Sequence, residues 1–388
     1  MDLTFSPEQE AFRAELRAWF EENRPTERFD PVYTPAGLKQ HLEWERKLSD
    51  KGYSAPGWPV DAGGLGLDTW SQVVYDEEYN RLGLPERVNK MGLLHGGPTV
   101  LEHGTDEQRR AWLPGILNCD QIWCQGFSEP DAGSDLAALR TTGEIVGDEI
   151  IINGQKTWTS NGTLASRMFA IIRTDTTVPK HKGISFVVFD LDVPGVEIRP
   201  MAQLHGNAGF AEVFFTDVRI PLANVVGKLN DGWNVAATSL ILERGTGRGN
   251  HTKIMHSLDG LIATVAERRP DDTAALERLG SLRAWAFAYE QATYASIDGV
   301  VRGAPDNGGS SVIKLRWSEI QTAIYEEQLA TFGDEAEVVS ESGPNGEFVG
   351  WQRNYWHSRA GEIYAGTNEV QRNIIAERML GLPREVRP

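Results

Sequence analysis

The segment LILERGTGRG, which begins at Leu240, places a carboxylate where an apolar side chain is expected. The residues before it space Trp233, Ala236 and Leu240 by three and four positions, which is the spacing of one helical face. The next position on that face is Glu243. A carboxylate on a buried helical face loses hydration, and this makes it a stronger proton acceptor. Taken alone, Glu243 is more simply one half of a structural Glu–Arg pair between packed helices, and a carboxylate that accepts a proton is the alternative.

Other kinds of site near Glu243 are poorly supported by the sequence. Gly245, Gly247 and Gly249 carry no side chains, which leaves room for a ligand against the helix. His251 and His256 are five residues apart, and this is not the spacing of a metal pair on one helical face. No serine or cysteine lies in a nucleophile-elbow pattern.

The composition excludes several classes of function. The chain has 388 residues, with 40% hydrophobic and 24% charged residues, and this is ordinary for a globular protein of two or three domains. A net charge of −17 argues against a nucleic-acid or anionic-membrane surface. Cys119 and Cys124 are the only cysteines, too few for a disulfide framework, and they are expected to be reduced thiols. With no signal-peptide pattern and no long apolar run, we expect a cytoplasmic protein without membrane insertion.

The hydrophobic periodicity changes twice along the chain. We predict an N-terminal α-helical domain over residues 1–119, whose first helix follows Ser6 as the N-cap. Period-two strands over 120–229 predict a middle antiparallel β-barrel or sandwich, with a hairpin turn at Asn153-Gly154. Long amphipathic helices over 230–388 predict a C-terminal four-helix bundle. The fold class is therefore α+β multidomain.

Three motifs in this order resemble signatures of the acyl-CoA dehydrogenase family. They are GFSEPDAGSD at 126–135, INGQKTWTSNG at 152–162 and YAGTNEVQRNIIAERMLG from Tyr364. The resemblance extends over nearly the whole chain. It implies an FAD-dependent enzyme with helical, β and helical domains, usually a tetramer. Such enzymes remove hydrogens from the α and β carbons of a CoA thioester and pass electrons to an electron-transferring flavoprotein.

The resemblance also implies which residues contact FAD. A flavin needs hydrogen-bond partners along its edge and an apolar wall on one face. The matching positions lie in two strand segments, one tight turn and the C-terminal turn: Gln125, Phe127, Ser128, Gly133, Ser134, Trp158, Thr159, Ser160, Gly366 and Thr367. Ser134 also matches a position close to the CoA phosphate. Taken alone, Phe127 or Trp158 is more simply a core aromatic of the β domain.

The C-terminal turn lacks the glutamate that acts as the base in most of the family. Its position here is Ala365, which cannot accept a proton. Some relatives hold the base on the helix that faces the same carbon, immediately before an arginine, and Glu243 with Arg244 matches that arrangement. The backbone N–H of Ala365 is expected to bind the thioester carbonyl, and Arg244 to contact the substrate. The small side chain at 365 favours a branched or bulky acyl group.

Two family elements that reach a neighbouring subunit are altered. An Arg…Phe-Gly motif is replaced by AERRPDD, which keeps Arg268 and Arg269 but has no Phe-Gly. A Gln-x-x-Gly-Gly loop becomes ATFGDE, with Ala330 for Gln and Asp334 for the second glycine. An aspartate there repels a pyrophosphate unless it points away. A homo-oligomer with rebuilt loops and a hetero-oligomer with a paralogue both fit these changes.

The sequence therefore leaves three functions open. The first is an acyl-CoA dehydrogenase with FAD as cofactor and Glu243 as base. The second is a non-catalytic or co-dependent subunit of a mixed tetramer. The third is an acyl-CoA oxidase-like flavin enzyme, which reduces oxygen directly.

Overall fold

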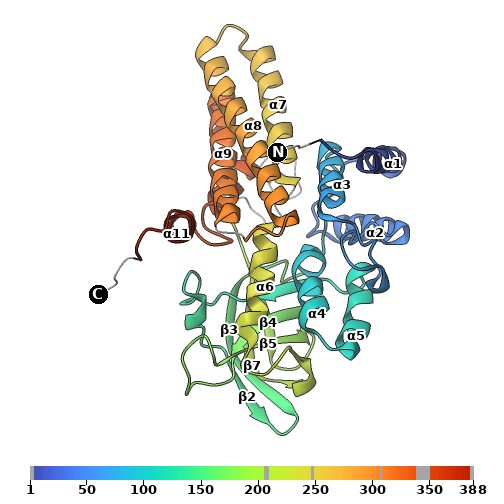
Figure 1. Ribbon diagram of the computed structural model, residues 1–388, viewed down its shortest axis with the longest axis vertical. Coiled ribbons are helices and arrows are strands. Elements are labelled where there is room, and N and C mark those ends of the chain that lie inside the picture. Colours follow the sequence, from blue (N-terminus) through green and yellow to red (C-terminus); the bar gives the residue numbers. More distant parts are fainter. Residues whose placement is uncertain (1–3, 205–208, 246–248, 306–307, 338–349, 385–388) are drawn as a thin grey trace.

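The computed structural model describes residues 4–204, 209–245, 249–305, 308–337 and 350–384. The sheet lies at one end of the molecule, and helices α7, α8 and α9 stand side by side at the other end (Figure 1). Helix α6 runs from the sheet to this bundle, while the N-terminal helices lie along one side. The predicted α+β architecture, with helical, β and helical parts, is confirmed. The domain boundaries near residues 120 and 230 stay a prediction.

The N-terminal part is helical, as its periodicity predicts. Its main helices are α1 (Pro7–Asn23), α2 (Pro35–Lys51), α3 (Thr69–Arg81), α4 (Gly97–His103) and α5 (Asp106–Leu117), with a π-helical turn η2 (Gly92–Gly96) before α4. Ser6 caps α1 in a reciprocal capping box with Gln9, which satisfies two backbone donors at the helix start. No helix within the described ranges is long and apolar enough to cross a bilayer.

The middle part is an eight-stranded sheet with the order β6-β7-β3-β2-β4-β5-β8, and β1 pairs with β4. The strands are β1 (Trp123–Gly126), β2 (Thr142–Val146), β3 (Glu149–Ser160), β4 (Arg167–Arg173), β5 (Ile184–Asp190), β6 (Val196–Met201), β7 (Phe210–Pro221) and β8 (Val225–Val226). Most pairs are antiparallel, but β1–β4 and β2–β4 are parallel. Strand β1 therefore enters the sheet beside β4 rather than through a hairpin.

The predicted hairpin turn at Asn153-Gly154 is wrong. Strand β3 continues through these residues with a register shift, and the hairpin turn lies between Val146 and Glu149, with Gly147 at φ 63°. A Cβ added at Gly154 would lie 2.6 Å from Thr141 Oγ1. The glycine therefore permits a close approach of the backbones within the sheet rather than a reversal of the chain.

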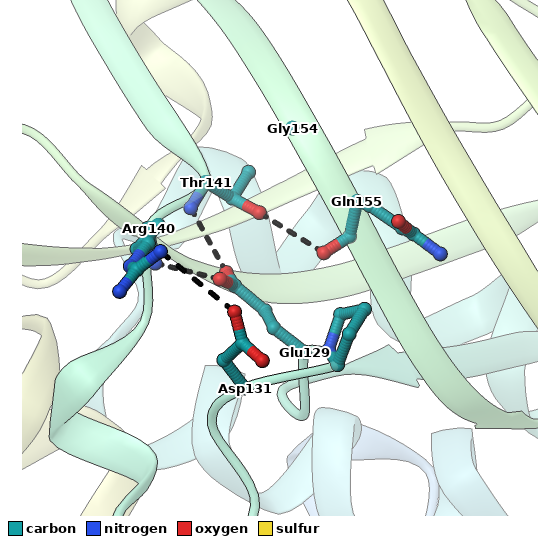
Figure 2. Close-up of a pocket in the computed structure, with 7 residues that line it drawn as sticks. Glu129, Asp131, Arg140, Thr141, Gly154 and Gln155 are labelled. Carbon is teal, nitrogen blue, oxygen red and sulfur yellow. Dashed lines mark hydrogen bonds and ion pairs between the residues drawn. The ribbon is translucent and has the colours of Figure 1, made fainter.

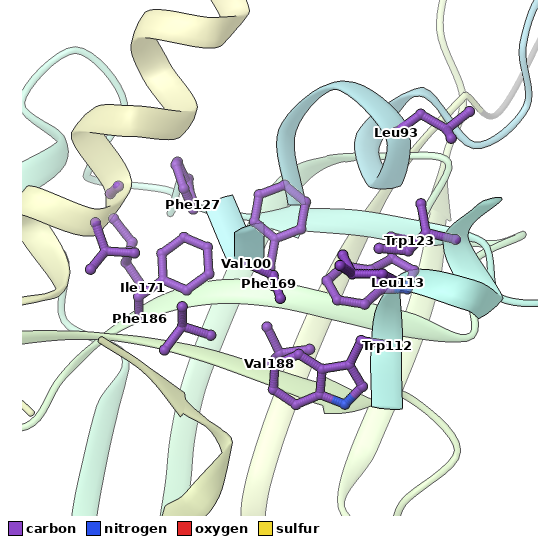
Figure 3. Close-up of a cluster of buried hydrophobic side chains, with 14 of the residues drawn as sticks. Leu93, Val100, Trp112, Leu113, Trp123, Phe127, Phe169, Ile171, Phe186 and Val188 are labelled. Atoms are coloured by element: carbon purple, nitrogen blue, oxygen red, sulfur yellow. The ribbon is translucent and has the colours of Figure 1, made fainter. Parts of the chain in front are cut away.

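The sheet is packed on both faces because alternate residues of its strands point to opposite sides. On one face, Trp123, Phe127, Phe169 and Phe186 form a buried cluster with side chains of α4, α5 and α6 (Figure 3). On the other face, residues such as Met168 pack among side chains of β3, β5 and β7. Packing on both faces of the sheet therefore fixes the positions of the ends of β1 and β3.

The C-terminal part is again helical. Its elements are α6 (Gly232–Gly245), α7 (Asn250–Arg268), α8 (Thr273–Val301), α9 (Gly309–Phe332), η6 (Gly333–Glu337), α10 (Gly350–Gly361), α11 (Asn368–Ile374) and a final π-helical turn η7 (Ile375–Met379). Apolar side chains of α7, α8 and α9 share one buried cluster. Helix α10 also packs against α9.

Candidate functional site

Trp158 is the most exposed aromatic side chain of the proposed flavin segments. It lies on β3 where the register against β7 shifts between Lys156 and Thr159. Its backbone has φ 56°, a left-handed conformation that is strained for a bulky residue and concentrates at functional sites. Trp158 is 59% exposed, and its indole packs edge-on against Phe210 at 5.8 Å between ring centroids. This leaves a flat aromatic surface available to a planar ring.

A buried ion pair fixes this segment to the end of β1. The Lys156 ammonium is fully buried and donates to the Phe127 carbonyl oxygen at 3.1 Å and to Glu129 Oε1 at 2.7 Å. Glu129 also accepts from the backbone N–H groups of Arg140 and Thr141, at 2.6 and 3.0 Å. The protein's own groups therefore provide the ion-pair and hydrogen-bond partners of the buried Glu129 carboxylate. Such partners offset the free-energy cost of burying a charge.

The charge state of this pair follows from its surroundings. Burial lowers the pKa of Lys156 to about 8, against the attraction of Glu129. Burial acts to raise the pKa of Glu129, but Lys156 and the backbone donors outweigh it, so this pKa lies below its usual value. Both groups are therefore charged at neutral pH.

The predicted flavin residues of β1 and β3 are brought together. The Thr157 N–H donates to the Ser128 carbonyl oxygen at 2.9 Å, which places the Ser128 segment beside Trp158. Gln125 and Ser128 are half-buried, and Ser160 is half-buried at the end of β3. The side chains at these positions can still reach a ligand.

Two predicted residues have side chains that face the protein interior. The Phe127 ring is 4% exposed and packs edge-on between Phe169 and Phe186 (Figure 3). Thr159 is fully buried, and its Oγ1 has no hydrogen-bond partner among the residues that the structure describes. We therefore expect these two residues to contact a cofactor through their backbone groups. The Phe127 ring is therefore part of the hydrophobic core, while the Phe127 carbonyl oxygen accepts a hydrogen bond from Lys156.

Gly133 and Ser134 lie in the exposed loop after β1. A Cβ added at Gly133 would meet nothing within 4 Å. The loop begins with a tight turn in which the Glu129 and Ala132 backbones exchange two hydrogen bonds of 3.0 Å. The Lys156–Glu129 pair thus holds the base of this loop.

The C-terminal turn has a conformation suited to presenting backbone donors. Ala365 has φ 56° and Gly366 has φ 82°, so two successive residues are left-handed. The buried side chain of Gln371 donates to the carbonyl oxygens of both, at 3.0 and 3.1 Å. Thr367 caps α11 by accepting from the Val370 N–H. With both carbonyls held inside, the turn is a rigid element rather than a free loop.

Asn368 anchors this turn to the bundle. Its side-chain oxygen accepts from the Lys314 ammonium at 2.9 Å and from the Ser318 hydroxyl at 3.1 Å, both on α9. Asn368 and Lys314 are both buried. The position of the Ala365 turn therefore depends on α9.

The structure describes the helix that carries Glu243 but not this side chain. Trp233, Ala236 and Leu240 of α6 pack on the cluster beneath the sheet, as their spacing predicts. The side chains of Glu243 and Arg244 lie outside the described residues. The assignment of the base therefore stays a prediction, based on the helical spacing of Glu243 from Trp233, Ala236 and Leu240.

Gly249 serves a different purpose from the one predicted. A Cβ added there would lie 2.4 Å from Asn80 Nδ2 and 2.9 Å from Asp76 Cβ, so helix α3 fills that space. The Asn80 amide donates to the Gly249 carbonyl oxygen at 3.0 Å. The glycine therefore permits contact with α3, not with a ligand. Gly247 lies outside the described residues.

Asn161 links the end of β3 to the N-terminal helices. It has a left-handed φ of 55° and accepts from the Tyr33 hydroxyl at 2.8 Å, while its amide donates to the Val88 carbonyl oxygen at 3.2 Å. In the segment before the Ala365 turn, the His357 and Tyr364 rings lie 6.2 Å apart.

The two altered interface segments contact one another. Arg268, at the end of α7, forms an ion pair of 2.8 Å with Glu335 and lies over the Phe332 ring. Arg269 donates to the Ala330 carbonyl oxygen at 3.2 Å. Asp334 is exposed beside them. The Arg268 guanidinium is thus already bound to a carboxylate of its own chain.

A pocket of about 310 Å³ opens beside the Lys156–Glu129 pair (Figure 2). It is lined by Glu129, Pro130, Asp131, Arg140, Thr141, Gly154 and Gln155. The exposed Arg140 and Asp131 side chains lie 3.7 Å apart at this pocket. None of the predicted cofactor residues lines it, so we assign it no part in the chemistry.

Four residues that position the site were missed at the sequence level. Lys156 lies at an inward-facing position of β3, where an apolar residue is expected. A charged residue at such a position is the signal that drew attention to Glu243, and it could have identified Lys156 as well. Asn161 precedes a glycine, which is a signal for a left-handed residue. Glu129 and Gln371 carry no periodic signal, because their partners are far from any regular pattern.

Comparisons with known proteins agree with this arrangement. Family models of the N-terminal, middle and C-terminal domains of acyl-CoA dehydrogenases match residues 6–120, 124–218 and 230–380. The acyl-CoA dehydrogenase IpdE1 of Mycobacterium tuberculosis is 39% identical, over 97% of this chain and 99% of its own.

Two solved structures share the fold over nearly their whole length. The Tcur3481–Tcur3483 steroid ACAD has a TM-score of 0.85 and 28% identity, and covers 99% of this chain and 100% of its own. The ChsE4–ChsE5 complex from Mycobacterium tuberculosis has a TM-score of 0.82 and 28% identity, with the same coverage. The motifs, the three domain matches and the shared fold lead to one conclusion: the chain belongs to the acyl-CoA dehydrogenase family and is an oxidoreductase that acts on CH–CH groups.

Proposed function

We propose that the protein binds FAD and dehydrogenates an acyl-CoA thioester between its α and β carbons, with electrons passed to an electron-transferring flavoprotein. The observation that carries this proposal is the strained, exposed Trp158 held beside the Ser128 segment by the Lys156–Glu129 pair. Backbone strain and a fully satisfied buried ion pair cost free energy, and such costs are retained where a ligand requires the geometry. Bound FAD would supply the acceptor for the hydride that leaves the β carbon.

The protein's own residues fit FAD in three places. Trp158 offers an aromatic wall, and Ser128 and Ser160 offer hydroxyl groups along the ring edge. Gly366 and Thr367 would pack beside the flavin at the C-terminal turn. Gly133 and Ser134 would approach the cofactor or the CoA phosphate from the exposed loop.

Glu243 is the proposed base that removes the proton from the α carbon. Its helical face continues that of Trp233, Ala236 and Leu240, which points into the protein. Glu243 accepts the proton while Arg244 contacts the substrate. The Ala365 N–H donates to the thioester oxygen, where negative charge develops as the proton leaves. Because Gln371 binds the carbonyls of the turn, this N–H is already oriented before substrate arrives.

The test is the visible spectrum of the purified protein, titrated with CoA thioesters without oxygen. The Glu243→Gln variant should keep its flavin bands, because the wall at Trp158 is intact, but its bands should no longer bleach. Glu22→Gln, an exposed glutamate of α1, is the matched control and should bleach as the unmodified protein does. Normal bleaching by Glu243→Gln would contradict the assignment of the base.

The electron acceptor is tested by oxygen uptake. A dehydrogenase bleaches with thioester and consumes little oxygen until an electron-transferring flavoprotein or a dye is added. Rapid oxygen uptake with thioester alone would instead identify the oxidase-like alternative.

A second candidate, a co-dependent subunit of a mixed tetramer, is favoured by Arg268. Its guanidinium pairs with Glu335 in the same chain at 2.8 Å, and Asp334 adds a further negative charge nearby. A neighbour's flavin pyrophosphate would have to displace this pair and approach the aspartate. Two of the similar structures are themselves named as two-component assemblies.

Expression alone and together with a paralogue separates the two assemblies. A yellow homo-oligomer that bleaches by itself would support the first candidate. A colourless chain that stays colourless when FAD is supplied, and gains flavin only with a paralogue, would support the second. A branched or bulky acyl group, consistent with Ala365, is part of the proposal and is tested in the same thioester titrations.

A further inference from the structure

Helix α3 of the N-terminal part packs against the start of α7, shortly after the point at which α6 ends (Figure 1). Asn80, near the end of α3, donates from its side-chain amide to the Gly249 carbonyl oxygen at 3.0 Å. Gly249 is buried, and a Cβ added there would lie 2.4 Å from Asn80 Nδ2 and 2.9 Å from Asp76 Cβ. The backbone that leads into α7 therefore lies directly against α3, without room for a side chain between them.

A second contact joins the same two helices. Glu77 lies one helical turn before Asn80, and His251 lies in the first turn of α7. The Nε2 atom of His251 is 3.1 Å from Glu77 Oε1, and because a carboxylate only accepts hydrogen bonds, the imidazole N–H is the donor. His251 is 2% exposed and Glu77 is 8% exposed. The start of α7 is therefore held by two hydrogen bonds to one face of α3.

The Glu77 carboxylate is a strong acceptor in this contact. The Tyr294 hydroxyl of α8 and the Arg13 guanidinium of α1 also donate to it. Burial acts to raise the pKa of Glu77, but the hydrogen bonds from its neighbours outweigh burial, so this pKa lies below its usual value. Hydrogen bonds to an ionised acceptor are stronger than those to a neutral one. The hydrogen bond from His251 is therefore a firm link between α3 and α7.

Helix α6 is fixed from its other side by the sheet and by α4. Leu240 packs on the cluster beneath the sheet, and Thr238 Oγ1 lies 2.8 Å from His103 Nε2 of α4. Glu243 follows Leu240 and precedes Gly249 in the sequence. The proposed base therefore belongs to a short stretch of chain between two fixed points, one on the sheet side and the other on α3.

The position of the backbone at Glu243 matters because a general base must lie within hydrogen-bond reach of the proton that it removes. A displacement of about 1 Å can slow a reaction about a hundredfold. Loss of the contacts with α3 would leave the end of α6 fixed from one side only.

We propose that Asn80 and His251 are positioning residues for the removal of the α proton: through the contacts between α3 and α7 they fix the end of α6, and with it the Glu243 carboxylate. The inference rests on the proposed function, in which Glu243 is the base. The N-terminal helices thus take part in the reaction by fixing the geometry of the base rather than by contact with the reacting atoms.

The first test follows removal of the α proton alone. The flavin-loaded protein is incubated in deuterium oxide with the β-thia analogue of octanoyl-CoA, in which sulfur replaces the β carbon, so that no hydride can leave. Glu243 removes an α proton and returns a deuteron, and mass spectrometry measures the deuterium that the thioester gains. Asn80→Ala should slow this exchange by between about tenfold and a hundredfold at saturating thioester, while the dissociation constant of the thioester changes by less than about threefold.

Asn118→Ala is the matched control for Asn80→Ala. The Asn118 side chain accepts from the Ser49 hydroxyl at 2.9 Å, which is also an amide contact between two helical elements, α5 and α2. This variant should exchange the α hydrogens at the rate of the unmodified protein. An unchanged rate in Asn80→Ala, or an equal loss in Asn118→Ala, overturns this inference alone. Absence of exchange in the unmodified protein contradicts the proposed function itself.

The second test uses His251→Leu, which removes the donor to Glu77, and His251→Gln, which supplies an amide N–H in place of the imidazole N–H. The leucine variant should slow the α-hydrogen exchange as Asn80→Ala does, and the glutamine variant should recover most of the rate. Equal rates in the two variants, whether slow or unchanged, contradict the role of His251.

A third measurement tests the contact without flavin or thioester. Backbone amides in the first turn of α7 should exchange with deuterium oxide faster in Asn80→Ala and His251→Leu than in Asn118→Ala, because local opening becomes easier when the contacts with α3 are lost. Equal protection in the three variants would show that α3 does not hold this turn, and the inference would fail.

Discussion

Single residues in this protein act mainly by holding other groups in place. Lys156 does not face a ligand, yet it binds both the Phe127 carbonyl oxygen and the Glu129 carboxylate. A buried ion pair adds little net stability over an apolar pair, but removal of one partner leaves the other charge without compensation. The pair therefore matters as a geometric constraint on the Trp158 segment.

Replacement of Lys156 tests this constraint. Lys156→Met should lower the free energy of unfolding by about 3–5 kcal/mol, because Glu129 is left buried and unpaired. The double variant Lys156→Met/Glu129→Gln should recover part of this loss, since no charge remains buried. Urea unfolding of the three proteins measures both effects. A double variant no more stable than the single one would show that the pair is not the source of the cost.

Gln371 has the same kind of role at the thioester turn. Gln371→Glu keeps the shape but turns acceptor oxygens toward the carbonyls of Ala365 and Gly366. We expect a stability loss of about 1–3 kcal/mol, together with weaker thioester binding in flavin titrations. Arg372→Ala removes ion pairs at the surface, to Glu319 at 2.8 Å and to Glu369 at 4.0 Å, and should change neither quantity measurably. Equal effects of the two variants would argue against a specific role for Gln371.

Among the elements, the π-helical turn η2 connects the N-terminal helices to α6. His95 of η2 is 4% exposed, and its environment includes a backbone interaction with Ser239 of α6. Burial lowers the pKa of His95 from its ordinary 6.5 to about 4. The neutral imidazole is therefore the form that fits between η2 and the helix of the proposed base.

This histidine makes stability depend on pH. Between pH 6.5 and about 4 the unfolded chain binds the proton and the folded chain does not, so stability present above pH 6.5 is lost as the pH falls. The contribution is about 3 kcal/mol. Urea unfolding at pH 7 and pH 4.5 should show a smaller drop for His95→Gln than for the unmodified protein. The same drop in both proteins would assign the acid sensitivity to other groups.

At the scale of the whole molecule, one carboxylate joins the N-terminal helices to the C-terminal bundle. Glu77 of α3 accepts from Arg13 of α1 at 2.8 Å and from the Tyr294 hydroxyl of α8, and lies 3.1 Å from His251 of α7. Its side chain is only 10% exposed. Residues far apart in the sequence therefore meet at one buried charge, and the same contact region includes Gly249.

Loss of this carboxylate should weaken the whole assembly. Glu77→Ala should lower the free energy of unfolding by about 3–5 kcal/mol, because Arg13 loses a buried partner. Glu21→Ala removes an exposed partner of Arg81, 3.7 Å away, and should cost less than about 1 kcal/mol. Calorimetry should show a lower transition temperature only for Glu77→Ala. Equal shifts would mean that the network does not couple the two helical parts.

The sequence by itself determined the order of helical and β segments, the cap at Ser6 and the motifs of the family. Each of these depends on neighbours within a few turns or strand repeats, so hydrophobic periodicity and local chemistry are sufficient to predict it. The structure brings the Ser128 and Trp158 segments side by side, as the resemblance implies. Their contact with FAD stays a prediction.

Tertiary structure alone decided what the local pattern could not. Gly154 looks like a turn residue, but Thr141 of the neighbouring segment occupies the space beside it, and the chain reverses at Gly147 instead. In the sequence, Gly249 suggests space for a ligand beside the helix. In the structure, Asn80, which is 169 residues away in the sequence, occupies that space. Lys156 and Gln371 gain their roles only from distant backbone oxygens. Such partners are selected by packing of elements that are remote in the sequence, and no local pattern carries that information.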